Sequence, residues 1–270
     1  MENTNVSHLI KALGLKRQIV GVRFLAYKKE MESSAGKYLS SRTFCGLVYT
    51  ATQGQIVKAD QENLSCRSAA YALGIVSEPE FAYSGRMYGH SGLYASQSIA
   101  REVNDAMKHI PHKICGVEVG PLDKMKNADL IIIICNCKQA MRLMQGYAYG
   151  HGPAENLGSI GNQAMCSDLA AKPFMNHDIN ISLMCCGTRA AARCEEGEMG
   201  VSMPIDMFDS VVNGVIQTLN LTENNKAKKE ILARLDNPDE LGISVIMNYS
   251  YGTTTESYIR YCKKREAEEI

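Results

Sequence analysis

The 270-residue sequence lacks the short motifs that mark most enzymes and metal sites. It contains no CxxC pair, which removes both a thioredoxin-like redox pair and the usual half-site of a zinc knuckle. GxxxxGKS/T, GxGxxG, GxSxG and HExxH are also missing. Kinase, dehydrogenase and ordinary hydrolase functions therefore have no motif support.

Net charge and long apolar runs are missing too. The 29 Lys and Arg residues balance 29 Asp and Glu residues, so no charge excess favours nucleic acid or an anionic membrane surface. Met1–His8 lacks the basic and apolar regions of a secretory signal. The longest aliphatic run, Leu130–Ile134, is far shorter than the ~20 residues that span a bilayer. We expect a cytoplasmic protein that binds neither nucleic acid nor membrane.

What the chain does have is ten cysteines without an export signal. Cytosolic thiols stay reduced, so this number favours metal, cluster or redox chemistry over disulfides. Free cysteine is also a good small core residue. Cys115 and Cys262 lie in ordinary strand-like and helical patterns, where packing is a sufficient explanation.

Several cysteines occupy matching places in two loosely similar halves. Cys45 stands eight residues before Gln53, and Cys137 stands eight residues before Gln145; each glutamine is followed by glycine. A second thiol, Cys66 or Cys166, then opens an alanine-rich stretch in each half. Thiols at matching places predict one shared site.

Hydrophobic periodicity, with glycine and proline as punctuation, predicts alternating helices and strands. Helices are expected over residues 5–13, 45–52, 68–74, 91–109, 138–147, 206–219, 225–235 and 255–269. Strands are expected over residues 18–25, 55–58, 113–119, 128–134, 179–184 and 242–247. No linker requires a second domain. The prediction is one compact α/β domain over 1–270, with two related strand–helix halves and a helical C-terminal extension.

The strand over 128–134 is a continuous apolar run, typical of a strand buried on both faces. It leads into Cys135-Asn136-Cys137 directly before a helix, the position where open α/β sheets usually bind ligands. Alternate residues of a strand point to opposite faces, so at most one of the two thiols needs to face a site. The repeat favours Cys137.

Cys166-Ser167-Asp168 is expected at a helix start, where Ser and Asp cap backbone amides and the positive helix end biases a thiol toward thiolate. Simple capping by Ser167 and Asp168 is the alternative. His90 and His151 recur in two Tyr-Gly-His segments and are candidate acid–base groups or ligands, although a lone loop histidine is more often neither.

Arginines stand beside several thiols. Arg67 follows Cys66, and Arg189 and Arg193 precede Cys194. Such cations can lower a thiol pKa or hold an anionic substrate, so Arg67 joins Asp168, His90 and His151 as a candidate catalytic residue. Most exposed arginines are only solvated, which is the simpler interpretation of Arg193.

Five segments in order and spacing resemble the DUF169 family: Ser41–Cys45, Asn63–Gly74, Asn136–Arg142, Cys166–Asp168 and Met199–Pro204. The resemblance covers about residues 9–219, with about 220–270 as an extension. It implies an uncharacterised group found largely in anaerobic bacteria and archaea, and therefore a context rather than a reaction.

The resemblance implies that three thiols are metal ligands: Cys45, Cys66 and Cys166. Cys137 departs from the family pattern, which usually has proline at this place. Part of the family has a cysteine and glycine after a segment like Ile181–Leu183, which makes Cys186 the rival fourth ligand. A three-cysteine site with an open iron position is the remaining possibility.

Soft thiolates select iron–sulfur clusters, zinc or copper(I), and dispersed cysteines can assemble a four-thiolate cluster site. We expect an iron–sulfur protein, with a 4Fe–4S cluster, in anaerobic electron transfer or reductive chemistry. It would be an oxidoreductase, a lyase or an electron carrier. Its partner would be an electron-transfer protein or a small-molecule substrate, and a homo-oligomer is compatible with the sequence. The alternatives are a cofactor-free accessory or binding protein with structural cysteines, and a thiol enzyme with Cys166 or Cys66 as nucleophile.

Overall fold

The protein is described by a computed structural model that covers residues 3–111, 113–250, 259–260, 262–264 and 267. The fold is mixed α/β, as predicted. Contacts divide the chain into two compact units. A helical unit comprises Met1–Gly14, Met141–Gly152 and Asp209–Ile270, and a sheet unit comprises Leu15–Ala140 and Pro153–Phe208. The expected division between a core of about 9–219 and an extension stays a prediction.

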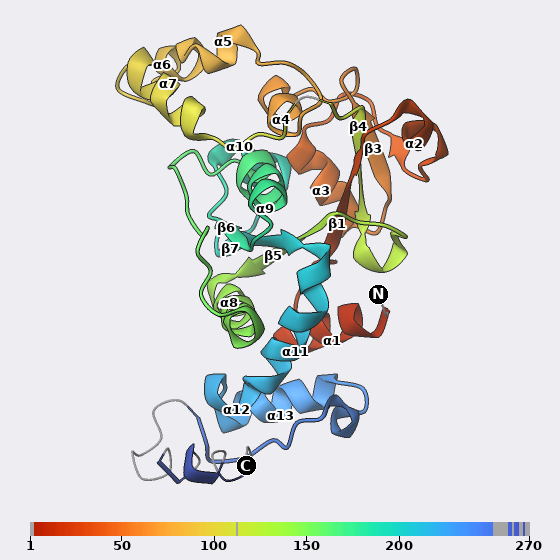
Figure 1. The fold of residues 1–270 in the computed structure, drawn as a ribbon, viewed down its shortest axis with the longest axis vertical. Helices are drawn as coiled ribbons and strands as arrows, with labels where there is room; N and C mark the ends of the chain where they lie inside the picture. The colour runs from red at the N-terminus through yellow and green to blue at the C-terminus, as the bar shows by residue number, and fades with distance from the viewer. Residues whose placement is uncertain (1–2, 112, 251–258, 261, 265–266, 268–270) are drawn as a thin grey trace. The chain divides into compact units, whose positions relative to one another are not determined.

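Seven strands in the described residues form the single sheet of the sheet unit (Figure 1). They are β1 (Val20–Leu25), β2 (Lys37–Tyr38), β3 (Val57–Asp60), β4 (Gly116–Pro121), β5 (Leu130–Asn136), β6 (Asn180–Ser182) and β7 (Glu198–Pro204). Their order is β2-β3-β4-β1-β5-β7-β6. Only the β2–β3 pair is parallel. Most paired strands are distant in the chain; β3, for example, ends at Asp60, and its partner β4 begins at Gly116.

β5 is buried along its length up to Cys135, which confirms the prediction from its apolar run. Leu130, Ile132 and Ile134 point into the main core of the unit. Because side chains alternate across a strand, Ile133 and Cys135 point to the other face of the sheet. Burial raises the pKa of the Cys135 thiol to about 12. Cys135 is therefore an inert core residue on the face opposite this core.

The helices of the sheet unit begin with α2 (Lys28–Ser33) and end with η3 (Ile205–Met207). Between them lie α3 (Phe44–Thr52), α4 (Arg67–Ala72), α5 (Glu80–Tyr83), α6 (Arg86–His90), α7 (Gln97–Ala106), η1 (Leu122–Lys124), the π-helix η2 (Ser167–Ala171), α9 (Lys172–Asn176) and α10 (Cys186–Ala191). α3 packs on β1, β3 and β4, while η2 packs on β5, β6 and β7. Both α3 and η2 contribute residues to the main core, and each begins at a cysteine-bearing segment.

The helical unit contains α1 (Asn3–Leu13), most of α8 (Cys137–His151), all but the first residue of α11 (Phe208–Gln217), and then α12 (Leu219–Thr222), α13 (Asn225–Arg234) and η4 (Pro238–Leu241). Gly146 and Gly214 let α8 and α11 approach closely, since a Cβ on Gly214 would lie 2.0 Å from the Gly146 carbonyl oxygen. The buried Arg142 guanidinium donates to Glu223 at 2.6 Å and to the Val215 carbonyl at 2.6 Å.

Two C-terminal predictions have different outcomes. The strand expected over 242–247 is wrong, because the segment has no strand neighbour. The Asn220 side chain holds it instead, donating to the Ser244 carbonyl at 3.0 Å and accepting from the Ile246 amide at 2.8 Å. The helix expected over 255–269 lies largely outside the described residues. Among the helices that are described, none has the length and apolar character needed to cross a membrane.

Candidate thiol-cluster site

Four cysteines from separate segments of the sheet unit start helices around one place in the core. Thr43 caps α3 and puts Cys45 in its first turn, where the Thr43 hydroxyl accepts from the Gly46 amide at 3.0 Å. The other three stand at the N-caps of α4, η2 and α10. We call this group the thiol cluster: Cys45, Cys66, Cys166 and Cys185.

The sulfurs of Cys45, Cys66 and Cys185 all lie within electrostatic reach of the Cys166 sulfur. Burial is the main cause that raises the pKa of Cys45 to about 12; the Thr188 hydrogen bond opposes this shift, and the sulfurs of Cys185 and Cys66 add to it. Burial is also the main cause that raises the pKa of Cys166 well above its ordinary value, and the other three sulfurs of the cluster add to this shift. Cys166 is only 5% exposed. Without a cation, the thiols of Cys45 and Cys166 stay protonated at neutral pH.

One threonine joins two members of the cluster. The Thr188 hydroxyl lies 3.4 Å from the Cys45 sulfur and accepts from the Cys185 thiol at 3.3 Å. The Thr188 amide donates to the Cys185 sulfur at 3.4 Å, in the N-cap position of α10. Thr188 is buried, so its hydroxyl fixes the first turns of α3 and α10 against each other.

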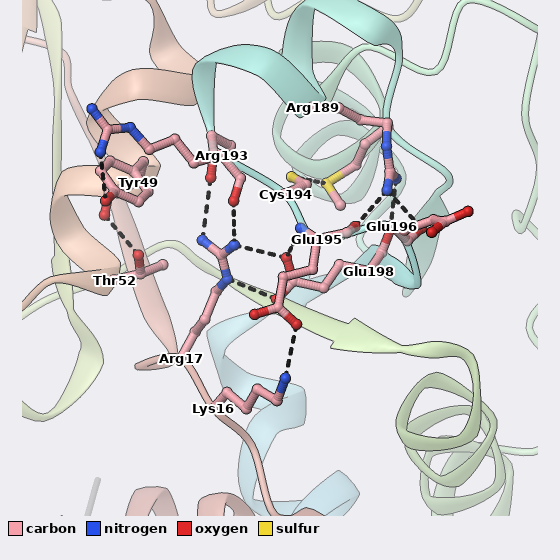
Figure 2. Close-up of polar contacts among 12 residues, drawn as sticks. Lys16, Arg17, Tyr49, Thr52, Arg189, Arg193, Cys194, Glu195, Glu196 and Glu198 are labelled. Atoms are coloured by element: carbon pink, nitrogen blue, oxygen red, sulfur yellow. Dashed lines mark hydrogen bonds and ion pairs between the residues drawn. The ribbon is translucent and has the colours of Figure 1, made fainter.

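An arginine network secures the far end of α10 (Figure 2). Arg17 donates to both Glu198 oxygens, at 2.8 and 2.7 Å, and to the carbonyl of Arg193 at 2.6 Å. Arg189 donates to the carbonyls of Leu183 at 3.3 Å and Glu198 at 2.8 Å. These bonds tie the segments before and after α10 together and so hold Cys185 in place.

The same network shows which groups the arginines beside Cys194 contact. Arg189 is occupied by backbone carbonyls, and the Arg193 guanidinium lies over the Tyr49 ring of α3, 5.0 Å from its centroid. Burial raises the pKa of Cys194, although Arg17 and Arg189 oppose the shift. The arginines are thus structural, and they do not activate this thiol.

Cys137 and Cys186, the two predicted rivals for the fourth position, are both exposed. Cys137 starts α8 beside a reciprocal cap in which the Gln139 amide donates to the Asn136 side chain at 2.9 Å and the Asn136 amide donates to Gln139 at 2.8 Å. The rule that placed a ligand there belongs to parallel sheets, whereas β5 is antiparallel to both of its neighbours.

Cys185 is the functional candidate that sequence reasoning missed. The vicinal pair Cys185-Cys186 was visible, but the choice between them depends on where α10 begins. Cys185 is the N-cap and faces Thr188, whereas Cys186 is the first helical residue and lies exposed. The signal available in the sequence was the Cys-x-x-Thr spacing, which is the spacing of an N-cap and its third helical residue.

The predicted catalytic candidates do not gather at one place in the sheet unit. His90 ends α6 and is exposed, and Arg67 is exposed with a bond to the Gln61 carbonyl at 3.1 Å. His151 belongs to the helical unit, where its ring stacks on Tyr147 at 4.9 Å. Asp168 is buried beside the thiol cluster in η2, and burial raises its pKa to about 6.

In the described part of the chain, no three His, Cys, Asp and Glu side chains form a group that could hold a metal ion. A cavity of about 550 Å³ opens beside Tyr38, Asp60, Glu62 and Lys113, and none of the four thiols lines it.

Comparison with known proteins returned two matches. The sequence model of the DUF169 family, described as "Uncharacterised ArCR", matches residues 8–214. An uncharacterized protein, MJ0308 of Methanocaldococcus jannaschii, is 24% identical over 214 residues, which is 78% of this chain and 92% of that protein. No solved structure matches the chain.

Proposed function

The chain belongs to the DUF169 family, whose description assigns no activity, and from its thiol cluster we propose that it is an iron–sulfur protein. We propose a 4Fe–4S cluster held by four thiolates, in electron transfer or reductive chemistry under anaerobic conditions. The observation that supports the proposal is that three thiols from other chain segments lie within electrostatic reach of the buried Cys166 sulfur. The ligands are the members of the thiol cluster: Cys45, Cys66, Cys166 and Cys185.

The electrostatics of the cluster favour a shared cationic centre. Each sulfur that ionises raises the pKa of its neighbours, and burial adds to that cost. Iron, as a bound cation, reverses this balance, because a coordinated thiol is deprotonated outright. Thiolates are soft ligands that select iron–sulfur clusters, zinc or copper(I). Four of them around one place match the ligand number of a 4Fe–4S cluster.

The position of the thiols also suits an anionic sulfur centre. The first backbone amides of a helix have no acceptor within that helix, and each member of the cluster stands in or beside such a turn. Hydrogen bonds to sulfur and exclusion of solvent are the main means by which a protein sets a cluster potential. Thr188 supplies a hydroxyl and a backbone amide as further hydrogen-bonding groups to the sulfurs. Cys166 is buried, so solvent is excluded from its sulfur.

A cluster with four thiolate ligands supplies one-electron transfer to a partner, whereas one with an open iron acts as a Lewis acid on a substrate. Whether Cys185 is a ligand distinguishes the four-thiolate form from the form with an open iron, because Cys185 is the ligand that the family resemblance does not include. With Cys185 ligated, the expected partner is an electron-transfer protein. With three ligands, a small-molecule substrate would take the open position.

The test is anaerobic purification and reconstitution with iron and sulfide, followed by visible absorbance and by iron and sulfide assays. Wild type should hold about four iron and four sulfide ions per chain. Cys45→Ser, Cys66→Ser and Cys166→Ser should lose most of both. Cys186→Ser is the matched control, since this thiol is adjacent in sequence to Cys185 but exposed, and it should load like wild type.

The Cys185→Ser variant distinguishes the two forms of the proposal. Loss of loading supports four thiolate ligands, and retained loading with an altered spectrum supports an open iron position. A colourless wild type without iron after anaerobic reconstitution would refute both. The thiol-nucleophile alternative has little support at Cys166, because burial holds its pKa far above neutral and only thiolate is nucleophilic.

A further inference from the structure

A row of three charged side chains crosses the sheet on the face opposite the main core. In the strand register, Lys58 of β3 is paired with Glu118 of β4, and Glu118 is paired with Arg23 of β1. Directly paired residues of neighbouring strands share a face of the sheet. Their chain neighbours Val22 and Val117 belong to the main core, so the charged row lies on the other face. Glu118, in the middle of the row, is only 6% exposed, so this face holds a buried carboxyl group.

The Glu118 carboxyl group is held through one of its two oxygens. Its Oε1 atom accepts from the Ser34 hydroxyl at 2.5 Å and from the Gly36 amide at 2.8 Å. The Lys58 ammonium donates instead to the carbonyls of Met31 at 2.5 Å and Ser34 at 3.2 Å. The described residues supply no hydrogen bond to Oε2, and Glu118 lines a cavity. Oε2 is therefore an acceptor for a ligand in this cavity.

The cavity beside Glu118 is small and has an apolar wall. Its volume is about 180 Å³, below the ~300–1,000 Å³ of pockets for drug-sized ligands, so it suits a molecule of a few heavy atoms. Met125 and Ile56 form the apolar wall. They pack over two glycines of the sheet: a Cβ on Gly21 would lie 2.9 Å from the Met125 sulfur, and a Cβ on Gly120 would lie 3.0 Å from Ile56. An alkyl group of the ligand would contact this wall.

Three cationic side chains line the same cavity: Arg23, Lys124 and Lys126. The Arg23 guanidinium donates to Glu30 at 3.3 Å, and Lys124 donates to the Gly54 carbonyl at 3.1 Å. A guanidinium has five N–H donors, so Arg23 keeps donors for a ligand. Lys126 is exposed and adds an ammonium group. The cavity thus presents several positive donors beside one carboxylate acceptor.

We propose that this cavity binds a small α-amino acid. The ligand ammonium would donate to Glu118 Oε2, and the ligand carboxylate would accept from Arg23 and Lys126. The buried carboxylate repels a ligand that is only an anion, and the three cations repel a ligand that is only a cation. Directly paired residues lie about 4.5–5.5 Å apart at Cβ, so Arg23 and Glu118 reach two charged groups joined by a single carbon. No cysteine lines the cavity, so the inference is independent of the iron–sulfur proposal.

The experiment is isothermal titration calorimetry of the full chain with glycine, L-alanine and L-serine. Propionate and ethylamine are the matched probes, because each keeps the size of L-alanine but lacks one of its two charged groups. At least one of the three amino acids should bind at a single site. L-alanine should bind at least tenfold more tightly than propionate or ethylamine, since a hydrogen bond to a charged group contributes about 1.5–3 kcal/mol.

Three variants locate the site. Glu118→Gln keeps an acceptor for Ser34 and Gly36 but loses the charge, and should weaken amino-acid binding about tenfold or more. Lys126→Ala changes an exposed side chain and should weaken it about two- to fivefold. Glu32→Gln is the matched control: this exposed carboxylate lines the separate cavity of about 550 Å³, and its loss should leave binding unchanged.

Circular dichroism establishes that each variant is folded, and Lys126→Ala decides the outcome if Glu118→Gln is not. The inference is overturned if none of the three amino acids binds wild type, or if propionate binds as tightly as L-alanine. It is also overturned if Glu118→Gln and Lys126→Ala bind like wild type. None of these results bears on iron and sulfide loading, which is measured separately.

Discussion

Removing Glu198 should weaken the sheet unit strongly, because its partner Arg17 is almost as buried as Glu198 itself. The two side chains are 12% and 9% exposed and meet through two short bonds (Figure 2). Truncating one partner of a buried ion pair costs about 3–5 kcal/mol, since the other charge is left uncompensated. Arg17 keeps the carbonyls of Ala192 and Arg193 as acceptors. We therefore expect Glu198→Ala to lower the free energy of unfolding by about 2–3 kcal/mol.

The assay is urea unfolding at pH 7 of Arg17→Met, Glu198→Ala and the double variant. The coupling energy from this cycle should be about 2 kcal/mol. Lys16 and Glu195 provide the matched control in the same network: they are also 2.8 Å apart, but 74% and 61% exposed. Their cycle should give no measurable coupling, because water screens an exposed pair. An Arg17–Glu198 coupling no larger than the control would show that the network does not hold α10 in place.

Two further perturbations test the fold. The Asp129 carboxylate accepts from the Phe24 amide at 2.6 Å, and burial is the main cause that raises its pKa. The folded state then binds more protons than the unfolded state above about pH 4, so wild type should lose stability relative to Asp129→Asn as the pH rises from about 4 to 7. A wild-type urea midpoint that stays constant or rises relative to the Asp129→Asn midpoint over this range would contradict this expectation. Gly214→Ala should lower the free energy of unfolding by about 1–3 kcal/mol, because overlap with the Gly146 backbone outweighs the gain of about 1 kcal/mol in helix propensity. Gly187→Ala, where nothing lies within 4 Å of the added methyl, should show no such loss in thermal unfolding.

Local signals in the sequence located most elements of the fold. The helix predicted over 45–52 matches α3 to within a residue, and the apolar run from Leu130 identifies β5 as a buried strand. Strand order was not accessible, because β1 pairs with both β4 and β5 through contacts distant in the chain. β7 was missed as a strand because its apolar residues are interrupted by glycine and serine.

The site was predictable only in part, for a similar reason. Three ligand candidates, Cys45, Cys66 and Cys166, came from the family resemblance, and the sulfurs of Cys45 and Cys66 lie within electrostatic reach of Cys166. The fourth candidate depends on where α10 begins: a helix start one residue later would make the exposed Cys186 the N-cap in place of the half-buried Cys185. Such a boundary is set by Thr188 and by the arginine bonds around α10, which the linear pattern does not contain.

Native mass spectrometry of the intact wild-type chain, purified and sprayed without oxygen, tests the central claim most directly. We predict a dominant species heavier than the bare polypeptide by the mass of one 4Fe–4S unit, and its disappearance in Cys166→Ser. A wild-type mass equal to that of the polypeptide alone, after reconstitution with iron and sulfide, would contradict the account.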